Sequence, residues 1–138
     1  MRVVGLDLGS RRIGVAVSDP SGTVASPHAV IERSGDEGAD HIAIAAMIIS
    51  LAAERVVVGL PLSLDGTLGP AARAAQAEVD ALAAVVPVPV ETHDERLTTV
   101  TAERALRVQK VRARDRRRVV DKVAAAVILQ SWLDSACG

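Results

Sequence analysis

Short apolar segments near the start of the chain constrain its fold most strongly. Val3–Leu8 and Ile13–Ser18 are both rich in β-branched residues, and the four residues Gly9–Arg12 between them indicate a hairpin. A turn then leads to a third expected strand at about Thr23–Ile31. Because Pro27 has no backbone N–H to donate to a neighbouring strand, we expect this third strand at an edge of the sheet.

Helix and strand patterns alternate after this point. The apolar residues Ile44, Met47, Ile48 and Leu51 recur at helical spacing and predict an amphipathic helix over about Asp40–Ala53. The elements expected after it are, in order, a central strand at Arg55–Leu60, a helix at Pro70–Ala84, a strand at Val88–Thr92, and helices at Thr98–Val108 and Arg117–Ser135.

This order predicts one α/β domain over residues 1–138. Strands joined by a tight turn pair antiparallel, whereas strands joined by a crossover helix pair parallel. The expected sheet is therefore mixed and five-stranded, with the first, fourth and fifth strands parallel.

Composition excludes several classes of protein. The chain has no Phe and no Tyr, and Trp132 is its single aromatic side chain, which excludes domains that stack nucleobases on aromatic platforms. Cys137 is the only cysteine, so neither an internal disulfide nor a cysteine–histidine zinc site is expected. The first residues lack a signal-peptide pattern and no apolar run approaches membrane-spanning length, so we expect a cytoplasmic protein without a membrane partner.

Charge is distributed unevenly although the net charge is only −1. Residues 1–103 carry 7 Lys and Arg against 14 Asp and Glu, whereas residues 104–138 carry 9 against 3. A concentrated basic segment can bind nucleic acid locally. We expect the segment preceding the last helix to be a mobile arm that contacts phosphates through Lys110, Arg112, Arg114, Arg116 and Arg117.

Asp7 needs an explanation because it ends an apolar strand. Strand alternation places it on one face with Val3 and Gly5, while Val4, Leu6 and Leu8 take the other face. Burying a carboxylate is costly unless it is paired, hydrogen-bonded or bound to a metal. One interpretation is a structural Asp that accepts backbone N–H groups of the hairpin. The other is a functional carboxylate, which Gly9 would allow a ligand to approach.

Two further acidic positions fit a functional interpretation. Asp94 and Glu95 follow the expected fifth strand, at the edge where parallel α/β sheets bind ligands. Asp121 lies near the start of the last helix, where an acid also favours the helix N-terminus without any further role. Separated carboxylates suit a hard cation, Mg²⁺ or Mn²⁺, and such ions in pairs serve phosphodiester hydrolysis.

Four segments, in the same order and across nearly the whole chain, resemble the signature blocks of the YqgF family, also called RuvX. These are GLDLGSRRIGVAVSD, VVGLPLSLDGT, HDERLTT and DKVAAAVILQSWL, at residues 5–19, 57–67, 93–99 and 121–133. The resemblance implies an RNase H-like fold and a nuclease, either resolving Holliday junctions or processing pre-16S ribosomal RNA. It also implies that Asp7, Glu95 and Asp121 form the metal-binding catalytic site, with Asp94 left open as a contributor.

Other residues of these segments have two interpretations each. Arg96 and the loop at Gly66 and Thr67 could contact phosphate or could serve as turn and capping residues. Ser10, Arg11 and Arg12 at the hairpin tip could touch the substrate backbone or simply be exposed. His93 could transfer a proton or be an ordinary histidine at the end of a strand.

The residues support three hypotheses about function. The preferred one is a metal-dependent endonuclease that acts on RNA as a monomer, with branched DNA as the alternative substrate if the chain forms a homodimer. A nucleotide-binding domain is the second, because Asp7, Gly9 and Gly14 resemble a phosphate-binding hairpin. The third is a non-catalytic RNA-binding factor, which three acidic positions beside a polyanion disfavour.

Overall fold

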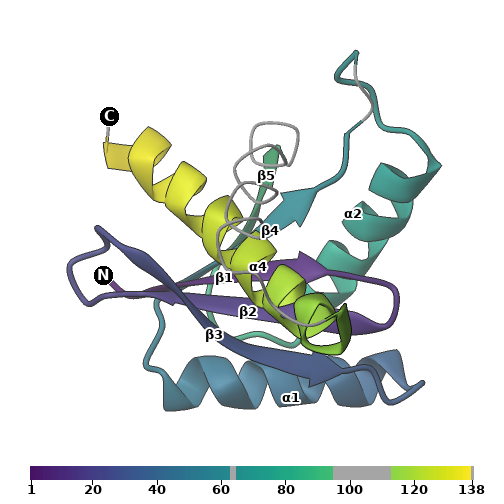
Figure 1. Cartoon of the computed structure of the whole chain (residues 1–138), viewed down its shortest axis with the longest axis horizontal. Helices are drawn as coiled ribbons and strands as arrows, with labels where there is room; N and C mark the ends of the chain where they lie inside the picture. Colours follow the sequence, from purple (N-terminus) through teal and green to yellow (C-terminus); the bar gives the residue numbers. More distant parts are fainter. Residues whose placement is uncertain (63–64, 95–112, 138) are drawn as a thin grey trace.

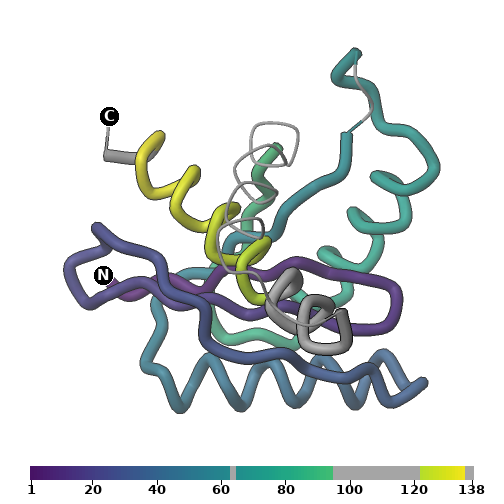
Figure 2. Tube along the Cα trace, viewed as in Figure 1, coloured from purple at the N-terminus to yellow at the C-terminus, as the bar shows by residue number. Residues whose placement is uncertain are grey.

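The computed structural model describes residues 1–62, 65–94 and 113–137, and within the last helix it describes the side chains of residues 122–135. The elements run, in order, β1 Val3–Leu8, β2 Arg12–Ser18, β3 Ala25–Glu32, α1 Glu37–Ser50, β4 Arg55–Leu60, α2 Pro70–Ala83, β5 Val90–Asp94 and α4 Ala113–Cys137 (Figure 1). Figure 2 traces the same path from the purple β1–β2 hairpin to the yellow end of α4. The predicted elements inside the described ranges are all present.

The five strands form one mixed sheet in the order β3-β2-β1-β4-β5. β1 pairs antiparallel with β2 and parallel with β4, and β4 pairs parallel with β5. This topology confirms the predicted parallel strands, the interior position of β4 and the edge position of β3. Pro27 lies opposite Ala16, beside a shift in register between Val15 and Ala16, where the edge strand needs no donor from proline.

Helices cover both faces of the sheet (Figure 1). On one face, Val4 and Leu6 of β1 belong to a buried apolar cluster with α1 and α2, to which Ile44, Ile48 and Leu82 contribute. On the other face, α4 packs across the sheet and forms a second cluster with Val3, Ala16, Val57, Ala125, Ile128, Leu129 and Leu133. β1 therefore runs between two separate apolar layers.

Local chemistry fixes the helix starts and the turns. Asp36 caps α1, since its carboxylate accepts the Ala39 N–H at 3.1 Å. Pro70 opens α2, where its missing N–H costs nothing. The turn after β2 is closed by the Gly22 N–H donating to the Asp19 carbonyl, 3.0 Å away. No helix within the described ranges is long and apolar enough to cross a lipid bilayer.

Several predicted boundaries were displaced along the chain, and those of α4 and β5 bear on the site. α4 begins at Ala113 and not at Arg117, so Arg114 and Arg116 lie within the helix and not in a segment that precedes it. Arginine and alanine have high helix propensity, which favours this earlier start. β5 extends to Asp94 because Leu60 of β4 pairs with it. Lys110, Arg112 and the helix predicted at Thr98–Val108 lie outside the described residues.

Candidate active site

Asp7 lies on the face of the sheet that α4 covers. It is half-buried near the end of β1, and it alternates with Val3 and Gly5 as the sequence predicts. Its partner across the hairpin is Gly14. The β1–β2 pairing therefore holds the Asp7 backbone in register at the carboxyl edge of the sheet, whichever of the two predicted roles its carboxylate has.

Close packing at Gly5 brings α4 against β1. A Cβ atom at Gly5 would lie 2.7 Å from the Leu129 Cβ and 3.0 Å from the Ala125 carbonyl oxygen, so only glycine fits there. α4 runs in the direction opposite to β1 (Figure 1). Residue 121 precedes Ala125 by one helical turn, and its backbone thus lies toward the end of β1 that bears Asp7. The side chain of Asp121 is outside the described part of the chain.

The register of β5 places His93 and Asp94 on opposite faces of the sheet. His93 pairs with Gly59 and Asp94 pairs with Leu60. The His93 side chain reaches α4, where its Nε2 lies 2.8 Å from the Ser131 Oγ, so His93 is on the same face as Asp7. Asp94 alternates to the opposite face, away from Asp7. Glu95 and Arg96 follow β5 immediately but lie outside the described residues.

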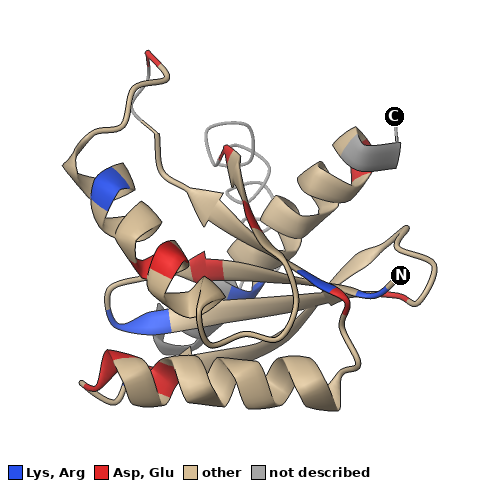
Figure 3. Ribbon diagram, turned by 180° about the vertical axis from the view of Figure 1, so that it is seen from behind, with Lys and Arg blue, Asp and Glu red and all other residues tan. Residues whose placement is uncertain are grey.

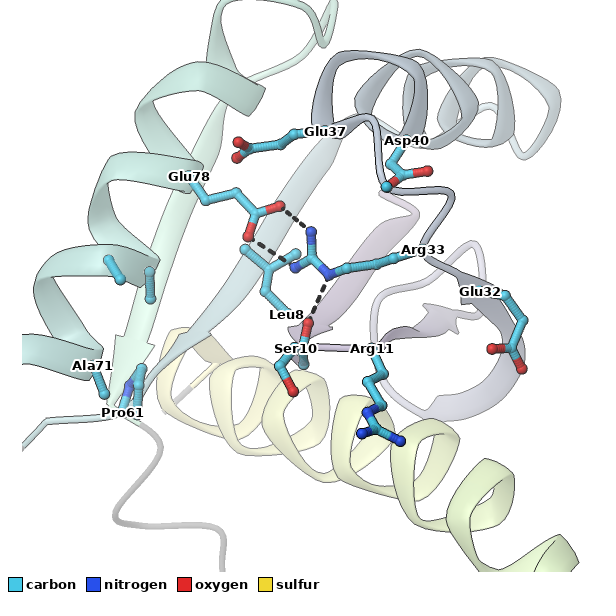
Figure 4. Close-up of a pocket in the computed structure, with 14 residues that line it drawn as sticks. Leu8, Ser10, Arg11, Glu32, Arg33, Glu37, Asp40, Pro61, Ala71 and Glu78 are labelled. Carbon is cyan, nitrogen blue, oxygen red and sulfur yellow. Dashed lines mark hydrogen bonds and ion pairs between the residues drawn. The ribbon is translucent and has the colours of Figure 1, made fainter.

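A pocket of about 850 Å³ opens beside the hairpin tip, on the face of α1 and α2 (Figure 4). Ser10 and Arg11 of the hairpin line it, together with Arg33, Glu78 and the alanines of α2. Arg12 lies within β2 opposite Glu32. Asp7 does not line this pocket, so the cavity and Asp7 lie on opposite faces of the same sheet edge.

An ion-pair network fills one wall of the pocket (Figure 4). The Arg33 guanidinium donates to both carboxylate oxygens of Glu78, at 2.9 and 2.8 Å, and the His41 Nε2 lies 2.9 Å from one of them. Burial raises the pKa of Glu78, but hydrogen bonds from Arg33 and His41 lower it by more, so the net pKa is below its usual value. The Glu78 hydrogen bond correspondingly raises the pKa of Arg33.

Acidic positions gather around this network, where α1 begins and α2 faces the end of β1 (Figure 3). Among the described residues, Glu37, His41 and Glu78 form a group whose ligand atoms lie within 4.8 Å of one another and could hold a metal ion. Arg33 already occupies both oxygens of Glu78, however, so a cation there would have to displace a guanidinium. The arrangement is better suited to holding protein segments together.

This network has no signature in the sequence. Arg33 and Glu78 are 45 positions apart, and His41 and Glu78 are 37 apart. The only local signal is the i, i+4 spacing of Glu37 and His41, whose side chains lie 3.7 Å apart. That spacing is common on solvated helix faces and carries no prediction of a tertiary contact.

Aspartate side chains hold the Gly66 loop and the turn after β2. The Thr67 N–H and hydroxyl both donate to the Asp65 carboxylate, at 3.0 and 2.7 Å, and Gly66 between them has a φ of 87°. Asp19 accepts hydrogen bonds from Ser21, Val24 and Thr23, which lower its pKa to about 2. These contacts favour capping over phosphate binding at the Gly66 loop.

The mixed sheet with β1, β4 and β5 parallel, and with helices on both faces, defines an RNase H-like domain. The chain belongs to the RuvX family: the family's sequence model, described as "Holliday junction resolvase", matches residues 1–135. The candidate pre-16S rRNA nuclease of Mycobacterium sp. (strain KMS) is 48% identical over 134 residues, covering 96% of this chain and 79% of that protein.

A second relative matches over almost its whole length. The candidate pre-16S rRNA nuclease of Anaeromyxobacter dehalogenans (strain 2CP-C) is 49% identical over 134 residues, and the match covers 97% of each chain. Among solved structures, Thermus thermophilus RuvC in complex with a Holliday junction substrate superposes with a TM-score of 0.61 at 17% identity, over 100% of this chain and 96% of that one. This structural likeness supports the fold.

Proposed function

We propose that this chain is a metal-dependent endonuclease whose Mg²⁺ or Mn²⁺ ligands are Asp7, Glu95 and Asp121. The observation that carries the proposal is the close approach of α4 to β1 at Gly5, on the face that bears Asp7. Residue 121 lies one helical turn from this contact, and β5 runs parallel to β4 and reaches the same edge just before Glu95. Three carboxylates are an oxygen-donor set suited to hard cations.

Bound divalent ions would supply the activation of a water molecule and the stabilisation of the leaving oxygen. The protein's own residues have separate tasks. Asp7 anchors the site on the most central strand. α4 positions residue 121, because Leu129 and Ala125 pack this helix against β1. His93, held by Ser131, lies on the same face and borders the site on the side of β5.

The proposed substrate is the 5′ region of pre-16S rRNA, as the names of the relatives suggest. A chain without Phe or Tyr recognises nucleic acid through its backbone and shape and not through stacked bases. Arg11, Arg12, Arg96, Lys110, Arg112, Arg114, Arg116 and Arg117 are the proposed phosphate contacts. One predicted acidic site per chain suits a single cut by a monomer in the cytoplasm.

A cleavage panel tests the proposal. Wild-type protein is incubated with Mg²⁺ or Mn²⁺ and with single-stranded RNA, precursor-rRNA mimics and four-way DNA junctions. We expect metal-dependent cutting of the rRNA mimics, its loss in Asp7→Asn, and its retention in Asp94→Asn, since Asp94 faces away from Asp7. Equal activity of wild type and Asp7→Asn would contradict the proposed site.

The same panel tests branched DNA as the alternative substrate, which the description of the family model favours. A resolvase makes paired, symmetric cuts and needs two active sites, so it would act as a dimer. Symmetric incision of four-way junctions by a dimeric species, with RNA left intact, would replace RNA by branched DNA as the substrate.

Salt dependence tests the arginines at the start of α4. Replacing Arg114 and Arg116 with Ala should weaken binding to all RNA sequences alike. The slope of log affinity against log salt concentration should fall by roughly 0.7–0.9 for each phosphate that the protein no longer neutralises. An unchanged slope would mean that these side chains face solvent and do not contact phosphates.

A further inference from the structure

Arg33 joins the hairpin that follows Asp7 to the rest of the domain. It lies just after β3, and its Nε donates to the Gly9 carbonyl at 2.7 Å. Its own backbone N–H donates to the Arg11 carbonyl at 3.0 Å. One residue thus holds both arms of the hairpin tip, and Gly9 in turn donates its N–H to the Asp7 carbonyl, 3.1 Å away.

Two helices hold Arg33 in place. The two Nη atoms of the guanidinium bind the Glu78 carboxylate of α2, so three of the five guanidinium N–H donors point at fixed acceptors. His41 of α1, whose side chain is only 3% exposed, contacts the same carboxylate. The planar guanidinium therefore has a single orientation, and Figure 4 shows it between Glu78 and the hairpin tip.

The geometry points to Arg33 as the positioning residue of the proposed active site, with Glu78 and His41 as its support. This inference rests on the proposed role of Asp7. A carboxylate that binds metal must be held within a fraction of an ångström, and Asp7 is followed by a hairpin whose tip is exposed. The Arg33 contacts fix that tip from the face opposite to the Asp7 side chain, so they position Asp7 without competing for the ion.

A second ion pair provides a matched control. Arg55 and Glu91 also form an Arg–Glu contact, between neighbouring strands β4 and β5, with side chains 36% and 38% exposed. The Arg55 guanidinium lies over the Trp132 ring, 5.8 Å from its centre, and Arg55 pairs with Val3 at the start of β1, the end opposite the hairpin tip. Glu91→Gln therefore removes the same kind of charge as Glu78→Gln without releasing Arg33.

The test measures hydrogen exchange and metal binding in Arg33→Gln, Arg33→Lys, Glu78→Gln and Glu91→Gln. Because hydrogen bonds to a charged group are among the stronger ones, exchange at the Gly9 and Arg33 amides should be about tenfold faster in Arg33→Gln. The Gly22 amide, in the turn at the other end of β2, should exchange as in wild type. Arg33→Lys should restore part of the protection, and Glu91→Gln should change none of it.

Mn²⁺ affinity and cleavage kinetics are measured on the same variants. Mn²⁺ affinity should fall in Arg33→Gln and Glu78→Gln, and cleavage should lose kcat while KM for RNA stays within about twofold, because the groups that bind the substrate remain. Folded variants with wild-type exchange at Gly9, or an equal loss in Glu91→Gln, would overturn the positioning role. If wild type binds no Mn²⁺ and cuts nothing, the proposed function fails, and faster exchange would then leave Arg33 only a structural anchor.

Discussion

The two faces of the sheet edge that carries the end of β1 differ in how they hold charge. On the α1 and α2 face, Arg33, His41 and Glu78 satisfy one another at hydrogen-bond distance within the chain. The α4 face bears Asp7, and there α4 approaches β1 through the small residues Gly5 and Ala125. One face is closed by its own ion pairs, whereas the other is assembled by close backbone packing.

This difference suggests a structural role for the α1 and α2 face and a metal-binding role for the α4 face. Arg33 and Glu78 already neutralise each other, so their face is suited to holding segments in place. The predicted ligands on the α4 face would bring like charges together, and such a group gains most from a cation supplied from solution. Substitutions on the two faces should therefore produce different responses to metal, to packing changes and to pH.

The largest effect is expected from metal binding on the α4 face. If Asp7 is a ligand, adding Mn²⁺ at a hundredfold excess over its Kd should stabilise the wild type by about 2.7 kcal/mol, and Asp7→Asn much less. Asp7→Asn should be as stable as wild type, or more so, without metal, because it removes one of several like charges. Thermal unfolding with and without Mn²⁺ measures both quantities.

The structural interpretation of Asp7 gives the opposite result. If its carboxylate mainly accepts hydrogen bonds of the hairpin, Asp7→Asn loses stability without metal, and Mn²⁺ has the same effect on both proteins. Glu91→Gln is the control, since it removes a carboxylate without releasing Arg33 and should keep the full Mn²⁺-induced stabilisation.

A smaller effect is expected from the packing of α4. Gly5→Ala places a methyl group 2.7 Å from the Leu129 Cβ, and we expect a loss of about 2 kcal/mol as the helix shifts outward. Gly38→Ala is the matched control in α1, where the nearest atom is the Asp36 carboxylate oxygen at 3.4 Å. There the substitution should stabilise by about 0.5 kcal/mol, because alanine favours a helix. Urea unfolding compares the two variants.

A Gly5→Ala variant as stable as wild type would show that α4 adapts freely at Gly5. The contact would then not define the distance between α4 and β1, and residue 121 would not be held near Asp7. A loss confined to Gly5→Ala, together with reduced Mn²⁺ binding, would support the proposed arrangement.

Much of the fold could be predicted because it follows from local patterns. The change from strand to helix periodicity predicted the sheet, and Pro27 placed β3 at the edge. Strand alternation correctly predicted that Asp7 shares one face of the sheet with Val3 and Gly5. The face on which Asp94 lies could not be predicted from sequence, because it depends on the pairing of Leu60 with Asp94 and hence on how far β5 extends.

The opposite face could not be predicted at all. Arg33, His41 and Glu78 come from a loop and two helices, and each looks like an ordinary solvated charge in its own segment. Only the folded chain brings Arg33 and His41 each within 3 Å of the Glu78 carboxylate. Charges distant in sequence pair according to topology, which periodicity and propensity do not encode.

The two Arg–Glu pairs should differ in their contribution to stability. Glu78→Gln leaves Arg33 and His41 with one partner fewer in a site where the Arg33 and Glu78 side chains are 18% and 13% exposed, and should cost about 1.5 kcal/mol. Glu91→Gln breaks a pair that is more than a third exposed and should cost within about 0.5 kcal/mol. Urea unfolding at neutral pH measures both, and a reversed order would contradict the importance given to the network.

The smallest effect is expected in the pH dependence of stability. The folded-state pKa of Glu78 is below its usual value of 4.5, so the folded chain binds fewer protons there than the unfolded chain. Glu78 therefore stabilises the fold at pH values above 4.5, and this contribution is lost as the pH falls through its folded pKa. Glu78→Gln should flatten the stability curve over that acidic interval and leave its slope at higher pH unchanged.

Asp19 provides the comparison for this measurement, because its pKa is lowered to about 2 by the turn after β2, far from the Arg33 network. Asp19→Asn should also flatten the acid limb, and a double variant should show the sum of the two changes, since distant sites act independently. Unfolding curves at several pH values between about 2 and 6 separate the two groups. An acid limb in Glu78→Gln identical to that of wild type would mean that Arg33 and His41 do not favour the ionised carboxylate, and the α1 and α2 face would then lose the charge pairing that distinguishes it from the α4 face.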